Sequence, residues 1–134
     1  MPLRNVIWLA VFLQALPMIT VEKGSYTSSD QARQVVVRTA DEWTKISREL
    51  SLRQTAAVPD FDQNMIVGVC LGSRPTAGYS VEILSVSRES DGLVARYRET
   101  RPARDAILAQ VITSPCHFVA VPKSSGQVRF EKAE

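Results

Sequence analysis

The residues that could perform nucleophilic chemistry in this sequence centre on its only histidine, His117. Ser114 and Cys116 lie close to it in the chain, and a serine or cysteine nucleophile needs a histidine base within hydrogen-bond reach. Ser114 precedes a proline and lacks the Gly-x-Ser-x-Gly context of a strand-to-helix nucleophile. Cys116 is adjacent to His117, and neighbouring residues on a strand point to opposite faces. The sequence therefore does not indicate a catalytic serine or cysteine.

Acidic residues, metal ligands and phosphate-binding loops give no stronger indication of an enzyme. Glu82 and Glu99 are the acids that could flank a cleft, but nothing in the sequence places them opposite each other. Two cysteines and one histidine cannot form a structural zinc site unaided. No glycine-rich phosphate loop is present. We therefore expect a protein with no catalytic activity, no cofactor and no bound metal.

The stretch most suited to recognition is GSRPTAGYSVEI, residues 72–83, which joins an apolar run to an alternating segment. Its two glycines can adopt backbone angles closed to other residues, and its proline fixes one dihedral, so the loop should be rigid and tightly turned. The candidate protein-binding residues are Arg74, Pro75, Thr76, Ala77, Gly78 and Tyr79. The alternatives are that the glycines only allow an ordinary turn between two strands and that Tyr79 belongs to the core.

Composition limits the classes of protein to which the chain can belong. At 134 residues, with 45% of them apolar, it is long enough for one domain with a substantial core and too short for two. The 16 basic and 14 acidic residues are spread along the chain without a run of five like charges. Because binding of nucleic acid needs clustered Lys and Arg, we do not expect a nucleic-acid partner. The sequence leaves the oligomeric state open.

The N-terminal segment, residues 6–19, is apolar except for Gln14 and follows Arg4, which is the layout of a signal peptide. Its 14 residues are too few for an ordinary transmembrane helix, so no stable membrane anchor is expected. We expect a signal peptide at residues 1–20 and a domain at residues 21–134 located in the periplasm, cell envelope or exterior. If residues 9–19 instead contribute a buried strand or helix, the protein would be cytoplasmic.

Hydrophobic patterning predicts a mainly β domain of the α+β class, with seven to eight short strands and one amphipathic helix. An antiparallel sandwich and a single curved sheet both fit. Strands are expected at residues 20–26, 35–37, 64–71, 79–83, 93–97, 107–112, 116–121 and 128–130. Thr39 and Glu42 form a capping-box pattern, after which Trp43, Ile46 and Leu50 share one helical face.

Two features of the predicted strands need a structural explanation. Gly68 interrupts the deepest strand, and a bulge or a closely packed neighbour would account for it. Cys70 and Cys116 each lie in apolar, strand-like surroundings. They could form a bridge in an oxidising compartment, but the commoner interpretation is two small buried residues.

The sequence MIVGVCLGSRPTAGYSVEI, residues 65–83, resembles the signature of the protease complex subunit PrcB family, in which an apolar strand precedes Gly-x-x-Pro-Thr-x-Gly-Tyr and an alternating strand. Residues 35–43, 97–102 and 107–122 resemble further segments of the family in the same order, although Cys116 replaces the expected aromatic residue. The resemblance implies a non-catalytic accessory or assembly subunit of an extracytoplasmic bacterial protease complex. The implied partner is a secreted serine protease or its precursor.

The segment RPTAGY, residues 74–79, is also similar to the Asn-Pro-Thr-Thr-Gly-Tyr loop of chagasin-like inhibitors of papain-type proteases. Arg74 replaces the asparagine, Val81 stands where a tryptophan would follow, and Arg101-Pro102 lacks the next tryptophan. This similarity implies the alternative function, a protease inhibitor that uses residues 74–79. A third possibility is a structural envelope domain without a protein partner.

Overall fold

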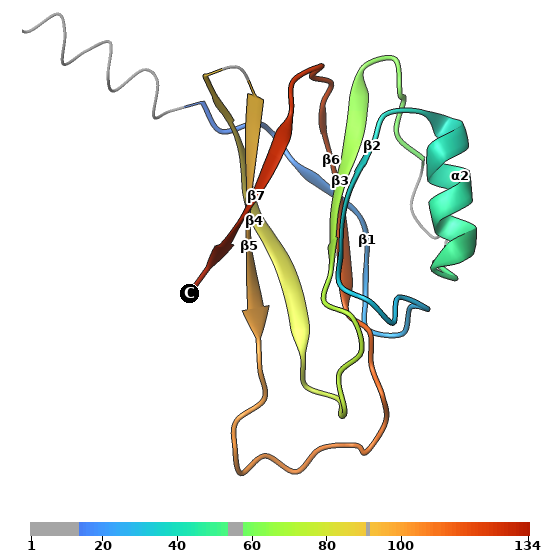
Figure 1. Cartoon of the computed structure of the whole chain (residues 1–134), viewed down its shortest axis with the longest axis vertical. Coiled ribbons are helices and arrows are strands. Elements are labelled where there is room, and N and C mark those ends of the chain that lie inside the picture. The colour runs from blue at the N-terminus through green and yellow to red at the C-terminus, as the bar shows by residue number, and fades with distance from the viewer. Residues whose placement is uncertain (1–13, 54–57, 91) are drawn as a thin grey trace, which may run out of the picture.

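The structure is a computed structural model that describes residues 14–53, 58–90 and 92–134. Its strands form a larger sheet in the order β1-β6-β3-β2 and a smaller sheet in the order β4-β5-β7, and the two sheets pack face to face (Figure 1). The strands are β1 Ile19–Gly24, β2 Arg33–Val37, β3 Asn64–Cys70, β4 Ser80–Glu89, β5 Gly92–Thr100, β6 Cys116–Pro122 and β7 Val128–Ala133. The predicted mainly β sandwich with seven strands is confirmed, except that β5 and β7 pair in parallel.

Strand β3 is the centre of the larger sheet, between β6 and β2. Every residue from Met65 to Cys70 is buried, as the unbroken apolar run predicts. One face of the strand packs against the smaller sheet, and the other lies under helix α2, Ala40–Glu49 (Figure 1). The loop that follows β3 therefore starts from the most constrained part of the molecule.

Helix α2 begins as the sequence predicts. The Thr39 hydroxyl accepts a hydrogen bond from the Glu42 backbone N–H at 3.1 Å and donates one to the Glu42 carboxylate at 3.1 Å. Trp43 is buried on the inner face of the helix, and its ring meets Phe118 of β6 edge-on with 5.4 Å between centroids. The helix is thereby fixed to the outer face of the larger sheet.

Phe118 also explains Gly68, which faces it from the paired strand β3. A Cβ atom at position 68 would overlap the Phe118 ring and approach Val35 Cγ2 to 3.0 Å. The closely packed neighbour expected from the sequence is therefore confirmed. The missing side chain at position 68 makes room for the largest fully buried ring in the core.

Cys70 and Cys116 form a disulfide between paired positions of β3 and β6. Both are buried, but the favoured interpretation of two separate cysteines is wrong. A sequence cannot show that residues 46 positions apart face each other. The bridge lies at the end of the larger sheet from which residues 72–79 emerge.

The predicted strand at residues 107–112 is also wrong. These residues are in irregular structure and have no strand neighbour in the described chain. Ile107 is fully exposed and Ile112 is 73% exposed, so the apolar run does not contribute to the core. Its apolar residues satisfied a strand pattern, but both sheets are completed by other strands. The loop that begins after Thr100 therefore continues to the region just before the start of β6 at Cys116.

The predicted signal peptide is described only in part, because residues 1–13 lie outside the described residues. Residues 14–18 run along the free edge of β4, where the Leu16 N–H donates to Val86 O at 2.8 Å and the Arg88 N–H donates to Gln14 O at 3.0 Å. Leu16 and Met18 pack against the core between the sheets. Within the described chain, no helix has the length and apolar character needed to cross a membrane.

A chain that starts at Ile19 is expected to be less stable than one that starts at Gln14 by about 1–3 kcal/mol, because Leu16 and Met18 leave the core. Urea unfolding followed by fluorescence measures this difference. Trp43 is the only tryptophan in both shortened chains, so it reports on the core alone. Equal unfolding midpoints would contradict the expectation.

Candidate functional site

Residues 72–79 and 101–113 form one end of the sandwich, which we call the two-loop end (Figure 1). Arg74 and Thr113 exchange two backbone hydrogen bonds, of 2.7 and 2.9 Å. The Ala77 N–H donates to Ala109 O at 3.1 Å, and the Thr113 hydroxyl donates to Thr76 O at 2.9 Å. Each loop therefore holds the other in place, and the rigidity expected of residues 72–79 arises from both loops.

The candidate residues of the first loop divide by exposure. Pro75 and Gly78 are exposed, whereas Arg74, Thr76, Ala77 and Tyr79 are half-buried. Arg74 donates from Nε to Glu99 at 3.0 Å and from Nη1 to Leu71 O at 3.1 Å. Its guanidinium also lies 5.9 Å from the centre of the Tyr79 ring. Arg74 is thus an internal brace, and Tyr79 packs beneath it.

Gly78 is required by the contact between the loops. Its φ of +94° lies in the left-handed region that favours glycine. A Cβ atom there would approach Pro102 Cβ to 2.8 Å and Leu108 Cδ2 to 3.0 Å. A side chain at position 78 would therefore separate the loops as well as strain the backbone.

The second loop carries exposed apolar side chains that the sequence analysis did not identify as site residues. Ile107 and Ile112 project into solvent, and Val111 between them is 41% exposed. Exposed apolar clusters on soluble domains mark surfaces that contact other molecules. The feature of the sequence that could have identified them is the apolar run at residues 107–112, which precedes Ser114 and Pro115. This run fitted a strand equally well.

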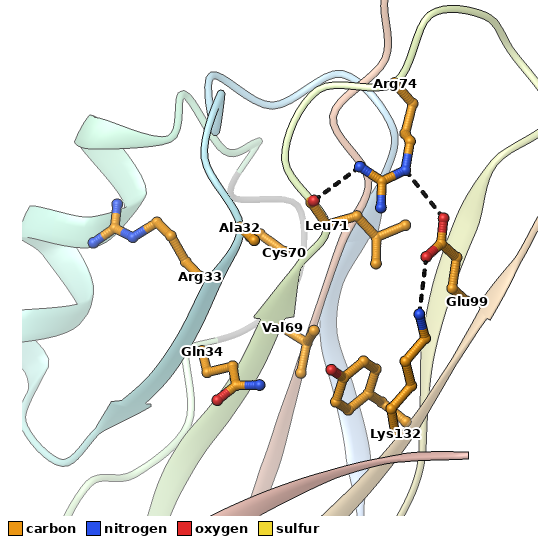
Figure 2. A pocket seen from close by; sticks show the side chains of 10 residues that line it. Ala32, Arg33, Gln34, Val69, Cys70, Leu71, Arg74, Glu99 and Lys132 are labelled. Atoms are coloured by element: carbon orange, nitrogen blue, oxygen red, sulfur yellow. Dashed lines mark hydrogen bonds and ion pairs between the residues drawn. The ribbon is translucent and has the colours of Figure 1, made fainter. Parts of the chain in front are cut away.

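A charged cleft of about 460 Å³ opens beside the two-loop end, between the two sheets (Figure 2). Glu99 of β5 lies on its wall with a side chain only 3% exposed. The Glu99 carboxylate is 3.0 Å from Arg74 Nε, 3.4 Å from Lys132 Nζ and 3.7 Å from Arg101 Nε. The hydrogen bond from Arg74 is the main cause of the lowered pKa of Glu99, aided by Lys132 and opposed by burial.

The structure separates the two acids that could have formed a catalytic pair. Glu99 contacts the cations of the cleft, whereas the Glu82 carboxylate lies 3.3 Å from Lys23 Nζ of β1. In the register of the two strands, Glu82 of β4 is opposite Arg98, and Glu99 of β5 is opposite Val81, so the two acids occupy successive positions and point to different faces. They do not share a site.

His117 is buried between the sheets and is engaged at both ring nitrogens. Its Nδ1 accepts a hydrogen bond from the Ile83 N–H at 2.9 Å, and its Nε2 lies 2.9 Å from the Thr20 hydroxyl. Burial lowers the pKa of His117 to about 4; nearby Lys23 also lowers it, and Glu82 raises it. Cys116 is held in the disulfide. Among the described residues, no group of three or more His, Cys, Asp or Glu side chains could hold a metal ion.

The lowered pKa of His117 predicts a pH dependence of stability. Between pH 6.5 and about 4, the unfolded chain binds a proton at His117 that the folded chain excludes. The free energy of unfolding should therefore fall as the pH drops through this window, with His117 contributing on the order of 2–3 kcal/mol. Urea unfolding at pH 7 and pH 4.5 measures the loss, which should be smaller in His117→Gln.

The imidazole C–H resonances give an independent check, because the chain has one histidine. Their chemical shifts should stay constant in the folded protein between pH 7.5 and 5.5. A titration centred near pH 6.5 would show that the folded protein accepts the proton and would contradict the prediction.

Part of the chain is similar to a known protein family. The family described as PrcB C-terminal matches residues 65–122, which run from β3 through β6 and include both loops of the two-loop end. No curated protein and no solved structure matches the chain.

Proposed function

We propose that this chain, whose residues 65–122 match the family described as PrcB C-terminal, is a non-catalytic accessory or assembly subunit of a protease complex. It would act by binding a protein partner through the two-loop end. The observation that carries this proposal is that the family match contains both loops, including the exposed Ile107 and Ile112. The partner would be a secreted serine protease or its precursor, as the resemblance to the PrcB protease complex subunit implies.

The two-loop end has the physical properties of a binding surface. Its loops are already held by hydrogen bonds between Arg74 and Thr113 and between Ala77 and Ala109, so binding would cost little conformational entropy. Fully burying one isoleucine side chain contributes about 1.5–3 kcal/mol. Contact of Ile107 and Ile112 with a partner, together with Pro75, would therefore provide useful affinity from a small area.

Several contacts support the non-catalytic and extracytoplasmic parts of the proposal. His117 is buried with both nitrogens engaged, so it is poorly placed to serve as a base for Ser114. The disulfide between Cys70 and Cys116 would persist in an oxidising compartment and is unusual in a reducing cytoplasm. The periplasm, the cell envelope or the exterior of a bacterium would satisfy this condition.

Affinity capture from the envelope and secreted fractions of the native host tests the proposal. The bait is the full chain, compared with an Ile107→Asp/Ile112→Asp variant. We expect the wild-type protein to recover a serine protease or its precursor, and the variant to recover at least about tenfold less of it, because loss of buried apolar contact weakens binding.

Val58→Asp is the control, because Val58 is 53% exposed and lies beside Asn64 and Pro122, away from the two-loop end. It places one of the two aspartates at an exposed β-branched residue in the segment before β3. It should capture the protease as well as the wild type does. Equal recovery by the Ile107→Asp/Ile112→Asp variant, or capture without any protease, would contradict the proposal.

The inhibitor alternative makes a different prediction. It requires residues 74–79 to enter the cleft of a papain-type protease, with micromolar protein inhibiting that enzyme. Pro75→Glu is the appropriate variant, because Pro75 is exposed whereas a side chain at Gly78 would disturb the contact with Pro102. Inhibition by the wild type and its loss in Pro75→Glu would favour the inhibitor, and unaffected papain would exclude it.

A further inference from the structure

The charged cleft occupies a place where a sandwich normally continues its apolar core. Alternation along β5 and β7 directs Leu93 and Ala95, and Val128 and Phe130, toward the larger sheet. The same alternation brings Glu99, four positions after Ala95, and Lys132, two positions after Phe130, onto the inner faces. The Glu99 side chain is only 3% exposed and loses solvation there unless it is paired, whereas Lys132 keeps 53% of its side chain exposed, so the buried carboxylate requires an explanation.

The cleft contains more positive than negative charge. Glu99 is the one carboxylate within 4 Å of Arg74, Arg101 and Lys132 in the described chain. Arg74 and Lys132 line the cleft with Glu99, whereas Arg101 lies outside its lining with a side chain that is 71% exposed, and Arg33 pairs with Glu49, so the cleft has a local excess of one positive charge. An excess of this kind is relieved by a bound anion.

Hydrogen-bond donors remain for such an anion. Arg74 uses Nε and Nη1, and its Nη2 makes no hydrogen bond among the described residues. Figure 2 shows the guanidinium of Arg74 and the ammonium of Lys132 on either side of Glu99, at the mouth of the same cleft. A carboxylate has two oxygens that can accept from a guanidinium and an ammonium together.

The cleft is also open to an extended chain. Its walls come from β2 and β7, which are the terminal strands of their sheets. The exposed Gln34 of β2 and the half-buried Tyr97 of β5 add neutral polar groups to the lining. A free strand edge can pair with an extended segment of another protein, and alternate side chains of that segment then enter neighbouring pockets.

We propose that this cleft binds the side-chain carboxylate of an acidic residue in an extended segment of a partner protein that lies along the free edge of β2. The carboxylate would accept hydrogen bonds from Arg74 Nη2 and Lys132 Nζ, with Gln34 at the rim. This site shares Arg74 with the two-loop end and contains none of its exposed isoleucines. Its test uses peptides and does not depend on the identity of the protease partner.

Three short peptides serve as probes of ¹⁵N-labelled full-length protein by NMR. They are acetyl-Val-Glu-Val-amide, acetyl-Val-Gln-Val-amide and acetyl-Val-Val-Val with a free C-terminal carboxylate. We expect saturable shifts of the amides of Gln34, Arg74, Glu99 and Lys132 with the glutamate peptide. The glutamine peptide should bind at least about tenfold more weakly, because it lacks the charge-assisted hydrogen bonds.

Lys132→Gln should weaken binding of the glutamate peptide about tenfold through loss of a charged donor. Arg129→Gln is the matched control, since it removes one positive charge from the same strand, where Arg129 faces outward and pairs with Glu89 and Glu131. It should leave the affinity unchanged. A ¹⁵N spectrum of each variant establishes that it is folded, and the comparison of peptides needs no variant.

Three results would overturn the proposal. The first is equal binding of the glutamate and glutamine peptides, which would remove the role of the carboxylate. The second is stronger binding of the free-acid peptide, which would assign the cleft to a chain terminus. The third is the absence of saturable shifts at the cleft residues, including shifts scattered over the surface.

Discussion

Replacing Phe118 with alanine is expected to lower the free energy of unfolding by about 3–5 kcal/mol. The ring is completely buried, lies over Gly68 of the neighbouring strand and meets the Trp43 ring of α2. Its removal would leave a cavity that the sheet cannot close, since β3 and β6 are fixed by their backbone pairing. The Trp43 ring of α2 would lose its edge-on contact with Phe118 at the same time.

Urea unfolding followed by Trp43 fluorescence in a chain that starts at Gln14 measures this loss. Phe61→Ala is the control, because Phe61 is only half-buried at the edge of the same cluster and should cost clearly less. If Phe118→Ala and Phe61→Ala were equally stable, the central position of the Phe118 ring would be contradicted.

The packing of Phe118 against Gly68 can be tested by a double substitution. Gly68→Ala alone should cost about 1–3 kcal/mol, because the added Cβ forces the ring out of its place. Combined with Phe118→Leu, which vacates that place, the same change should cost less than the sum of the two single changes. Additive costs would show that the two residues do not compete for the same space.

Removal of the disulfide is the second large effect. Cys70→Ala/Cys116→Ala should lower the free energy of unfolding by about 4 kcal/mol, because the bridge closes a loop across a sequence separation of 46 residues. Without it, the unfolded chain gains conformational freedom. The bridge also joins β3 to β6 next to the bond from the Leu71 N–H to Pro115 O, where both loops of the two-loop end begin or end.

The measurement compares urea unfolding of the wild type with and without reductant, alongside the double variant. Reductant should destabilise the wild type and leave the variant unchanged. The folded molecules of the double variant should also bind the partner more weakly than the wild type does, since both loops lose the covalent link at their base. A wild-type midpoint that does not respond to reductant would contradict the presence of a stabilising bridge.

The local patterns of the sequence predicted the elements well. Thr39 and Glu42 mark the start of α2, and the apolar run through β3 indicates a strand covered on both faces. These predictions succeeded because caps and hydrophobic periodicity depend on residues close together in the chain. The rigid loop at residues 72–79 was also predictable from its glycines and proline.

The other half of the candidate site could not be predicted in the same way. Residues 107–112 have the composition of a strand, but β1 and β2 already form the two edges of the larger sheet, so these residues remain exposed. Lys132 lies beyond the strand predicted at residues 128–130, yet it continues the alternation of Val128 and Phe130 and contacts Glu99. Each outcome depends on which strands become neighbours.

The sequence by itself determined the seven strands that form, the capped helix and the turns of residues 72–79, since each follows from interactions within a few residues, but it also predicted a strand at residues 107–112 that does not form. Only the tertiary structure decided that Cys70 bonds to Cys116, that Phe118 fills the space at Gly68, and that Arg74 and Lys132 share Glu99. The physical reason is that these contacts join residues distant in the chain, and strand order and register alone bring them together.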